Sequence, residues 1–188
     1  MNARRVLLAA ALASAAGGAA LLGTEAWLSA KAWLAGRLVE RAWVAHLEDG
    51  GVHRPWSWAD IHPVARVEVP RLGVVRTVLS GATGGTLAFG LGHVDGTARP
   101  GTGGHCALAG HRDSWAAFLR DVAVGDEVVL TTRAGAEHWR IAATRIVAAD
   151  DTTVLQPAAE PRLSLVTCYP FTGLLHSPWR FVAICERG

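Results

Sequence analysis

Residues 163–187 have the sequence LSLVTCYPFTGLLHSPWRFVAICER and are predicted to form two short strands joined by an open loop. The first, residues 163–168, is an apolar run rich in β-forming side chains, and it is bounded by Pro161 and Pro170. The second, residues 179–185, is again apolar and begins directly after a proline. If the two strands pair as neighbours, the end of the first lies beside the start of the second.

This pairing would bring reactive side chains together. Cys168 ends the first strand, and Arg180 lies near the start of the second. His111 follows another apolar run, residues 106–109, so it too is expected at the end of a strand. A thiol that attacks a carbonyl, a fixed cation that stabilises the oxyanion and an imidazole that transfers a proton together suit acyl transfer.

Three separated segments around these residues resemble those of the sortases, cysteine transpeptidases that cut a sorting signal and join the protein to an amine. The segments are LAGHRD at 108–113, LVTCYPF at 165–171 and WRF at 179–181. Sortases carry His, Cys and Arg in this order, with the cysteine in a TLxTC-like motif, and agreement of three motifs makes the resemblance specific. It covers residues 61–187 and is most like the class D or proteobacterial type. Ser164 is a mild departure, since the family more often has Thr there.

The resemblance implies an activity and a set of site residues. Cys168 would hold the acyl half of an LPxTG-like sorting signal as a thioester, until an amine or water releases it. His111 would protonate the leaving amine, because an amide nitrogen leaves poorly as an anion. Arg180 would clamp the oxyanion or the substrate, since its guanidinium stays charged, and Thr167 would help shape the substrate groove. The implied partners are an exported protein that carries the signal and an amine acceptor, and no cofactor is implied.

The chain between residues 64 and 147 supplies further strands, separated by turns rich in Gly and Pro. The predicted strands are residues 64–69, 74–79, 87–93, 106–109, 127–132 and 138–147. The pattern gives about eight strands and one or two short helices, and a parallel α/β sheet would need more helices. A closed or nearly closed β-barrel is therefore expected, and sortases have an eight-stranded barrel.

Composition limits the other functions open to the chain. Its 188 residues are 51% hydrophobic and include 21 glycines, which fits one β-rich domain with an appendage and argues against disorder. The net charge of +2 is supplied by Arg4 and Arg5, so the body is neutral. The chain therefore lacks the excess of positive charge that is typical of nucleic-acid binding.

Three regions are predicted: a signal anchor at 1–24, a helical stalk and linker at 25–60, and a catalytic barrel at 61–188. In the first, two arginines precede an uncharged run, residues 6–24, that would span about 28 Å as a helix. A retained anchor is favoured over a cleaved signal peptide, for which residues 13–15 offer a cleavage site. The positive-inside rule then puts the barrel outside the cytoplasm, on a single-pass membrane anchor.

The stalk is predicted from residues 27–47, which lack proline and are rich in Ala and Leu. Its helix should end at Asp49-Gly50-Gly51. Two alternatives stay open for its tryptophans, which either lean on the membrane interface or pack against the domain.

The cysteine and histidine residues allow two other features, a disulfide and a zinc site. Of the three cysteines, Cys168 is expected to be the free thiol, while Cys106 and Cys185 are expected in buried strands, with or without a disulfide between them. A zinc site has only weak support, because no CxxC or HExxH spacing occurs. Its candidate ligands are His105, Cys106, His111, Cys168 and His176.

Asp113 precedes Trp115, Phe118 and Leu119 at helical spacing. Capping of that helix is favoured over a role in orienting His111.

The sequence leaves three rival functions. An L,D-type transpeptidase would place its cysteine in a His-Gly-Cys context, whereas Cys168 follows Val166-Thr167. A hydrolase of the same fold would release its substrate to water. An inactive membrane-anchored scaffold that binds peptides would not need a thiol aligned with His and Arg.

Overall fold

A computed structural model describes residues 3–158, 160–172 and 177–188, and the chain divides into two compact units, Met1–Arg37 and Leu38–Gly188. Helix α1, Ala3–Asp49, continues across the predicted boundary at residue 24. It ends where predicted, since Gly50 has a left-handed φ of 76° and its N–H donates to the His46 carbonyl at 2.9 Å. Among the described residues, no helix combines the length and the apolar character that a membrane crossing requires.

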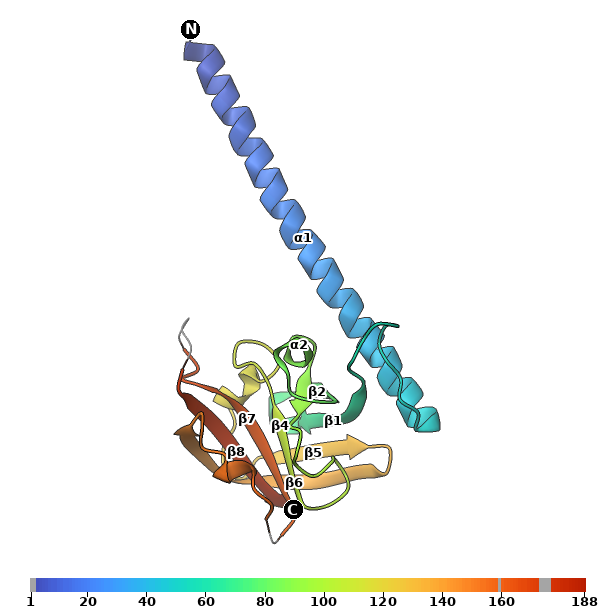
Figure 1. Ribbon diagram of the computed structural model, residues 1–188. Coiled ribbons are helices and arrows are strands. Elements are labelled where there is room, and N and C mark those ends of the chain that lie inside the picture. Colours follow the sequence, from blue (N-terminus) through green and yellow to red (C-terminus); the bar gives the residue numbers. More distant parts are fainter. Residues whose placement is uncertain (1–2, 159, 173–176) are drawn as a thin grey trace. The chain divides into compact units, whose positions relative to one another are not determined.

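Eight strands form a closed barrel in the order β1-β2-β3-β4-β7-β8-β6-β5, as the strand count predicted (Figure 1). Their bounds are β1 Pro63–Val69, β2 Val74–Leu79, β3 Leu91–His93, β4 His105–Ala109, β5 Glu127–Thr132, β6 Gly135–Ala148, β7 Arg162–Tyr169 and β8 Trp179–Arg187. The β2–β3 and β4–β7 pairs are parallel, and the remaining pairs are antiparallel. The short helical segments are α2, Gly84–Leu87, and 3₁₀ turns at Pro70–Leu72, Ala117–Arg120 and Thr153–Leu155.

Most strands lie where the alternating or apolar pattern predicted them, and residues 87–93 are the main exception. Only Leu91–His93 of that stretch is a strand, because α2 ends at Leu87 and a turn occupies residues 88–90. Thr83 caps α2 by accepting a hydrogen bond from the Thr86 N–H at 3.3 Å. Local side-chain capping therefore took precedence over an apolar pattern that is compatible with either structure.

The barrel interior is filled by aliphatic side chains from most strands, each nearly or completely buried. They include Val67, Leu108, Leu130, Ile141 and Leu165. Alternation of side chains along each strand follows from this core, because residues one position away must point out of the barrel. The outward face of the strands is therefore where a site can form.

The last turns of α1 belong to the second unit and pack on the barrel. Val39 and Trp43 are 4% and 1% exposed, and the Arg66 guanidinium lies 5.5 Å above the Trp43 ring. Arg66 also pairs with Glu40 at 2.5 Å. Val39 joins a small apolar cluster with Ala59 of the predicted linker and with Ile61. Of the two alternatives for the stalk, packing on the domain holds for this part of the helix.

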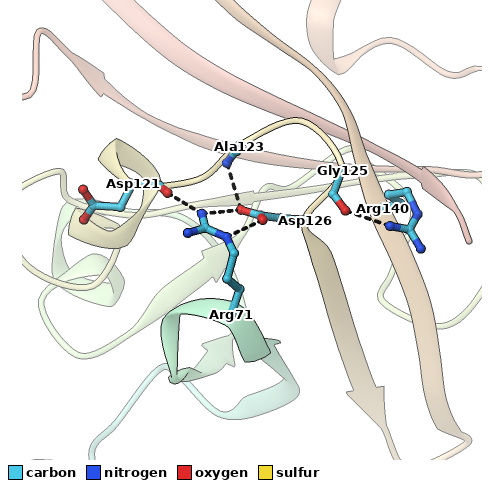
Figure 2. A network of polar contacts seen from close by, with 6 residues as sticks. All are labelled: Arg71, Asp121, Ala123, Gly125, Asp126 and Arg140. Atoms are coloured by element: carbon cyan, nitrogen blue, oxygen red, sulfur yellow. Dashed lines mark hydrogen bonds and ion pairs between the residues drawn. The ribbon is translucent and has the colours of Figure 1, made fainter.

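A polar network joins the turn after β1 to the turn before β5 (Figure 2). Arg71 donates from Nε and Nη2 to the two carboxylate oxygens of Asp126 at 2.5 and 2.7 Å, and from Nη2 to the Asp121 carbonyl at 2.6 Å. Asp126 also accepts a hydrogen bond from the Ala123 N–H at 2.8 Å. The hydrogen bond from Arg71 lowers the pKa of the Asp126 carboxyl. This network fixes one end of the barrel.

Candidate active site

Two of the three predicted catalytic residues lie on adjacent strands, and His111 follows the end of β4, the other neighbour of β7, by two residues. Cys168 of β7 and Arg180 of β8 are direct partners in the antiparallel register. On the other side of β7, Ala109 of β4 pairs with Val166, and the Gly110 N–H donates to the Val166 carbonyl at 3.1 Å. His111 comes directly after Gly110, so it leaves β4 at the end of the barrel where Cys168 lies, near the end of β7. Figure 1 shows these strands, β4, β7 and β8, next to one another.

The Cys168 and Arg180 side chains belong to the outer face of the barrel. Leu165 of β7 points into the core, so Cys168, three residues further along the strand, has the opposite orientation. His111 is exposed, and Cys168 is partly exposed. A peptide could therefore reach the thiol from outside the barrel.

The backbone of His111 is held tightly on both sides. Its carbonyl accepts hydrogen bonds from the N–H groups of Ser114 and Ala116 at 3.2 and 3.0 Å. Before it, Gly110 is so closely packed that a Cβ there would lie 2.6 Å from the Leu91 side chain and 2.8 Å from that of Ala116. The exposed imidazole is therefore carried by a rigid turn.

Thr167 connects this turn to the cysteine strand. Its side chain is 2% exposed, and its hydroxyl donates to the Gly110 carbonyl at 2.8 Å. The prediction that Thr167 shapes the substrate groove stays a prediction. The hydrogen bond supplies a way for it to do so, by fixing the residue that precedes His111.

Arg112 makes a second link that the sequence did not indicate. It is buried, 8% exposed, and its Nη1 donates to the Pro170 carbonyl at 2.8 Å. Arg112 and Pro170 follow His111 and Cys168 by one and two residues, so this bond ties together the two loops that leave the site. An arginine next to an aspartate reads as a solvated pair in sequence, and only the fold reveals its distant partner.

Arg180 is fixed at the start of β8. Its Nη1 donates to the carbonyls of Ser177 and Trp179 at 3.0 and 2.9 Å. These bonds keep a permanent positive charge on the strand next to the thiol.

The prediction that Asp113 caps a helix is wrong. The 3₁₀ helix Ala117–Arg120 begins after Ala116 and has no side-chain cap. Asp113 is four residues before it, and its carboxylate lies 3.4 Å from Nε of Arg112. The turn that holds the His111 carbonyl takes up the residues that a first helical turn would have needed.

The cysteines differ in their accessibility, and all three are free. Burial raises the pKa of the Cys106 and Cys185 thiols to about 12 each, so both stay protonated at neutral pH. Cys168 is the partly exposed one. It is therefore the thiol available for chemistry.

The candidate zinc ligands do not form a cluster where the structure describes them. No group of three or more His, Cys, Asp or Glu side chains in residues 3–158, 160–172 and 177–188 could hold a metal. Both ring nitrogens of His105 are within hydrogen-bond distance of other partners, Gln156 and Ser164. His176, the fifth candidate, lies outside the described residues.

Residues 67–188 match the family model of the sortase domain, which is well over half of the chain. The chain therefore belongs to the sortase family.

Individual relatives support the class D assignment. Sortase D of Bacillus subtilis (strain 168) is 30% identical over 122 residues, which are 64% of this chain and 62% of that protein. The chain thus spans less than two thirds of the length of that relative. The catalytic domain of B. anthracis SrtD is 34% identical with a TM-score of 0.58, covering 67% of this chain and 87% of that one. Sortase A from Corynebacterium diphtheriae is 26% identical with a TM-score of 0.63, covering 70% of this chain and 63% of that one.

Proposed function

We propose that the protein is a cysteine transpeptidase that cleaves an LPxTG-like sorting signal and transfers the acyl half to an amine. The observation that carries the proposal is that Cys168 of β7 and Arg180 of β8 are register partners, with His111 two residues beyond the end of β4, the other neighbour of β7. Membership of the sortase family supports the same activity.

In the proposed reaction, the Cys168 thiolate attacks the scissile carbonyl carbon, and the carbonyl electrons move to oxygen. Arg180 stabilises the negative charge on that oxygen. The oxyanion then collapses, the carbon–nitrogen bond breaks, and protonated His111 gives its proton to the leaving amine. The product is a thioester on Cys168, with the amine half of the signal released.

The second half of the reaction reverses these roles. The nitrogen of an incoming amine attacks the thioester, while neutral His111 takes its proton. The Cys168 sulfur leaves as a thiolate and the new amide is released. Water in place of the amine would give hydrolysis, so the fate of the thioester distinguishes a transpeptidase from a hydrolase of the same fold.

The proposed partners are an exported protein that bears the signal and an amine acceptor. We also propose that residues 1–24 anchor the protein in the cell membrane with the barrel outside the cytoplasm, on the basis of the two arginines that precede an uncharged run. Sedimentation with lipid vesicles tests the anchor. The full chain should sediment, and a chain that begins at Leu38 should stay in the supernatant.

Mass spectrometry of the protein mixed with LPxTG-like peptides tests the activity. A covalent adduct on Cys168 and ligation of an added amine are expected, and Cys168→Ala should abolish both while the protein stays folded. Cys106→Ala is the matched control, because that thiol is buried and protonated. Turnover by Cys168→Ala would remove this residue from the mechanism.

A further inference from the structure

His105, at the start of β4, belongs to a buried polar group that the proposed chemistry does not use. The residue is 4% exposed, with Nδ1 2.7 Å from the Gln156 carbonyl and Nε2 2.8 Å from the Ser164 hydroxyl. Because a carbonyl only accepts, Nδ1 carries a proton, and in the neutral ring Nε2 accepts from Ser164. Ser164, the departure from the usual family motif, is therefore the partner that completes the bonding of this histidine.

These side chains lie on the same face of the barrel as Cys168 and Arg180. Ser164 and Cys168 are four residues apart on β7, so they share an orientation, and His105 points to the same face because its Nε2 lies 2.8 Å from the Ser164 hydroxyl. Four residues of a strand span about 13 Å. A peptide that lies along β7 from the thiol would reach Ser164 within a few residues.

Exposure changes along this face. At the level of Ser164, which is 1% exposed, its β4 partner Ala107 is completely buried. One pair closer to the thiol, Ala109 and Val166 are partly exposed. The face is thus open near Cys168 and closed at the level of His105.

The connection from β6 to β7 accounts for this closure. β6 ends at Ala148, which pairs with Trp179, next to Arg180. By contrast, β7 begins at the other end of the barrel, at Arg162. In the barrel, β8 lies between these two strands, so the connection must cross β8. The core fills the interior, so the crossing runs over the outside. In agreement, Val182 on the outward side of β8 is completely buried.

Both ends of this crossing segment are held by hydrogen bonds. The Ala149 N–H donates to the Pro178 carbonyl at 2.6 Å, two residues before Arg180. At the other end, the Gln156 carbonyl accepts the bond from His105. His105 is the side chain that fixes the far end.

We propose that His105 is a positioning residue that holds residues 149–156 as a side wall of the peptide groove. Its Nδ1–H fixes the Gln156 carbonyl, and Ser164 fixes the orientation of the ring. The wall determines how tightly a peptide substrate binds, and it has no part in the bond-making steps at Cys168. This inference rests on the proposed function for its substrate.

Two substitutions of His105 separate its two hydrogen bonds. The amide nitrogen of Asn occupies the position of Nδ1, so His105→Asn keeps a donor for Gln156. The amide nitrogen of Gln occupies the position of Nε2, so His105→Gln keeps only the Ser164 side. Hydrogen exchange of residues 149–156, together with KM and kcat for an LPxTG-like peptide, would be measured for both variants and the wild type.

For His105→Gln we expect about tenfold faster exchange in residues 149–156 and about a tenfold rise in KM, the size of effect expected from one lost hydrogen bond. We expect kcat, and the rate of alkylation of Cys168 by iodoacetamide, to stay within about twofold of the wild type, because His105 has no part in the bond-making steps at Cys168. For His105→Asn we expect exchange and KM close to those of the wild type.

Unchanged exchange in His105→Gln would overturn the proposal, as would faster exchange with an unchanged KM. Equal effects of the two variants on KM would also overturn it, because they would point to a loss of general stability. A wild type that turns over no peptide would contradict the proposed function, whereas the exchange measurement would still report whether His105 holds the segment.

Discussion

The guanidinium of Arg180 is held in a fixed orientation, because it donates hydrogen bonds to two backbone carbonyls at the start of β8. One nitrogen, Nη1, contacts both Ser177 and Trp179. A planar guanidinium can make these bonds with one nitrogen and present others to a substrate oxygen. A lysine has a single nitrogen for both tasks.

We therefore expect Arg180→Lys to lower kcat by about 100-fold, the usual effect of losing an oxyanion donor. Arg145→Lys, at an exposed position of β6, is the matched control and should keep near-normal turnover. Single-turnover measurement of thioester formation would report the effect. A near-normal rate for Arg180→Lys would reduce Arg180 to a structural role.

Gly110 is a position at which close contacts leave no room for a side chain. A Cβ at this position would lie 2.6 Å from the Leu91 side chain. Gly110→Ala should lower the free energy of unfolding by about 1–3 kcal/mol, as overpacking usually does. It should also lower turnover, because the turn that carries His111 must shift.

Urea unfolding and peptide turnover would check both effects. Gly84→Ala is the control, since no atom lies within 4 Å of a Cβ there, and it should be nearly neutral. Unaltered turnover in Gly110→Ala would show that the exact position of the turn does not limit the reaction.

The sequence could predict that Cys168 and Arg180 lie at paired strand ends, because each stands next to an apolar run within a motif. It could not predict the roles of Arg112 and His105. Their partners, Pro170 and Gln156, are 58 and 51 residues away, so the bonds exist only after the barrel closes. Short-range patterns contain no information on such pairs.

At the scale of elements, strands were predicted well because their burial alternates. β1 follows a strict alternation of buried and partly exposed residues, and β2 and β5 have the predicted bounds. Short helices were predicted poorly. Asp113 has the right spacing for a cap, yet the backbone there satisfies its own hydrogen bonds in a turn, so no helix begins until Ala117.

The Arg71–Asp126 pair is a link between elements whose strength should depend on pH. Its hydrogen bonds lower the pKa of Asp126 in the folded protein. A folded pKa below the unfolded one gives stability that is present above the unfolded pKa, about 3.9. This stability is lost as the pH falls through the folded value, because the unfolded chain then binds the proton more readily.

Asp126→Asn should therefore lower the free energy of unfolding by about 1–3 kcal/mol at pH 7. The difference from the wild type should shrink as the pH falls below about 4, where the wild-type carboxyl loses its advantage. Asp121→Asn is the control, since Arg71 binds the backbone carbonyl of that residue. Denaturant unfolding at several pH values would measure the difference, and a constant difference down to pH 2 would argue against the ion pair.

At the scale of the whole molecule, the second compact unit begins within helix α1, at Leu38, and includes the last turns of that helix as well as the barrel. Apolar periodicity in sequence could not place this boundary, because the helix is continuous through it. What distinguishes the two parts of the helix is burial. Trp33 is 66% exposed, whereas Trp43 is 1% exposed.

Shortened chains would locate the boundary of the folding unit. A chain that begins at Leu38 should unfold with the same free energy as the full protein, because it retains Val39 and Trp43 against the barrel. A chain that begins at Ile61 should be less stable by about 3 kcal/mol or more, since it loses a buried tryptophan and uncovers Ile61 itself.

Trp43→Ala in the chain from Leu38 should reproduce most of that loss, which separates the packing of this side chain from the helix as a whole. Thermal and urea unfolding of the three chains would give the comparison. Equal stability of the chains from Leu38 and Ile61 would mean that the end of α1 contributes nothing to the barrel. The peptide groove would then depend only on the eight strands and their loops, and turnover per folded molecule should be the same in both.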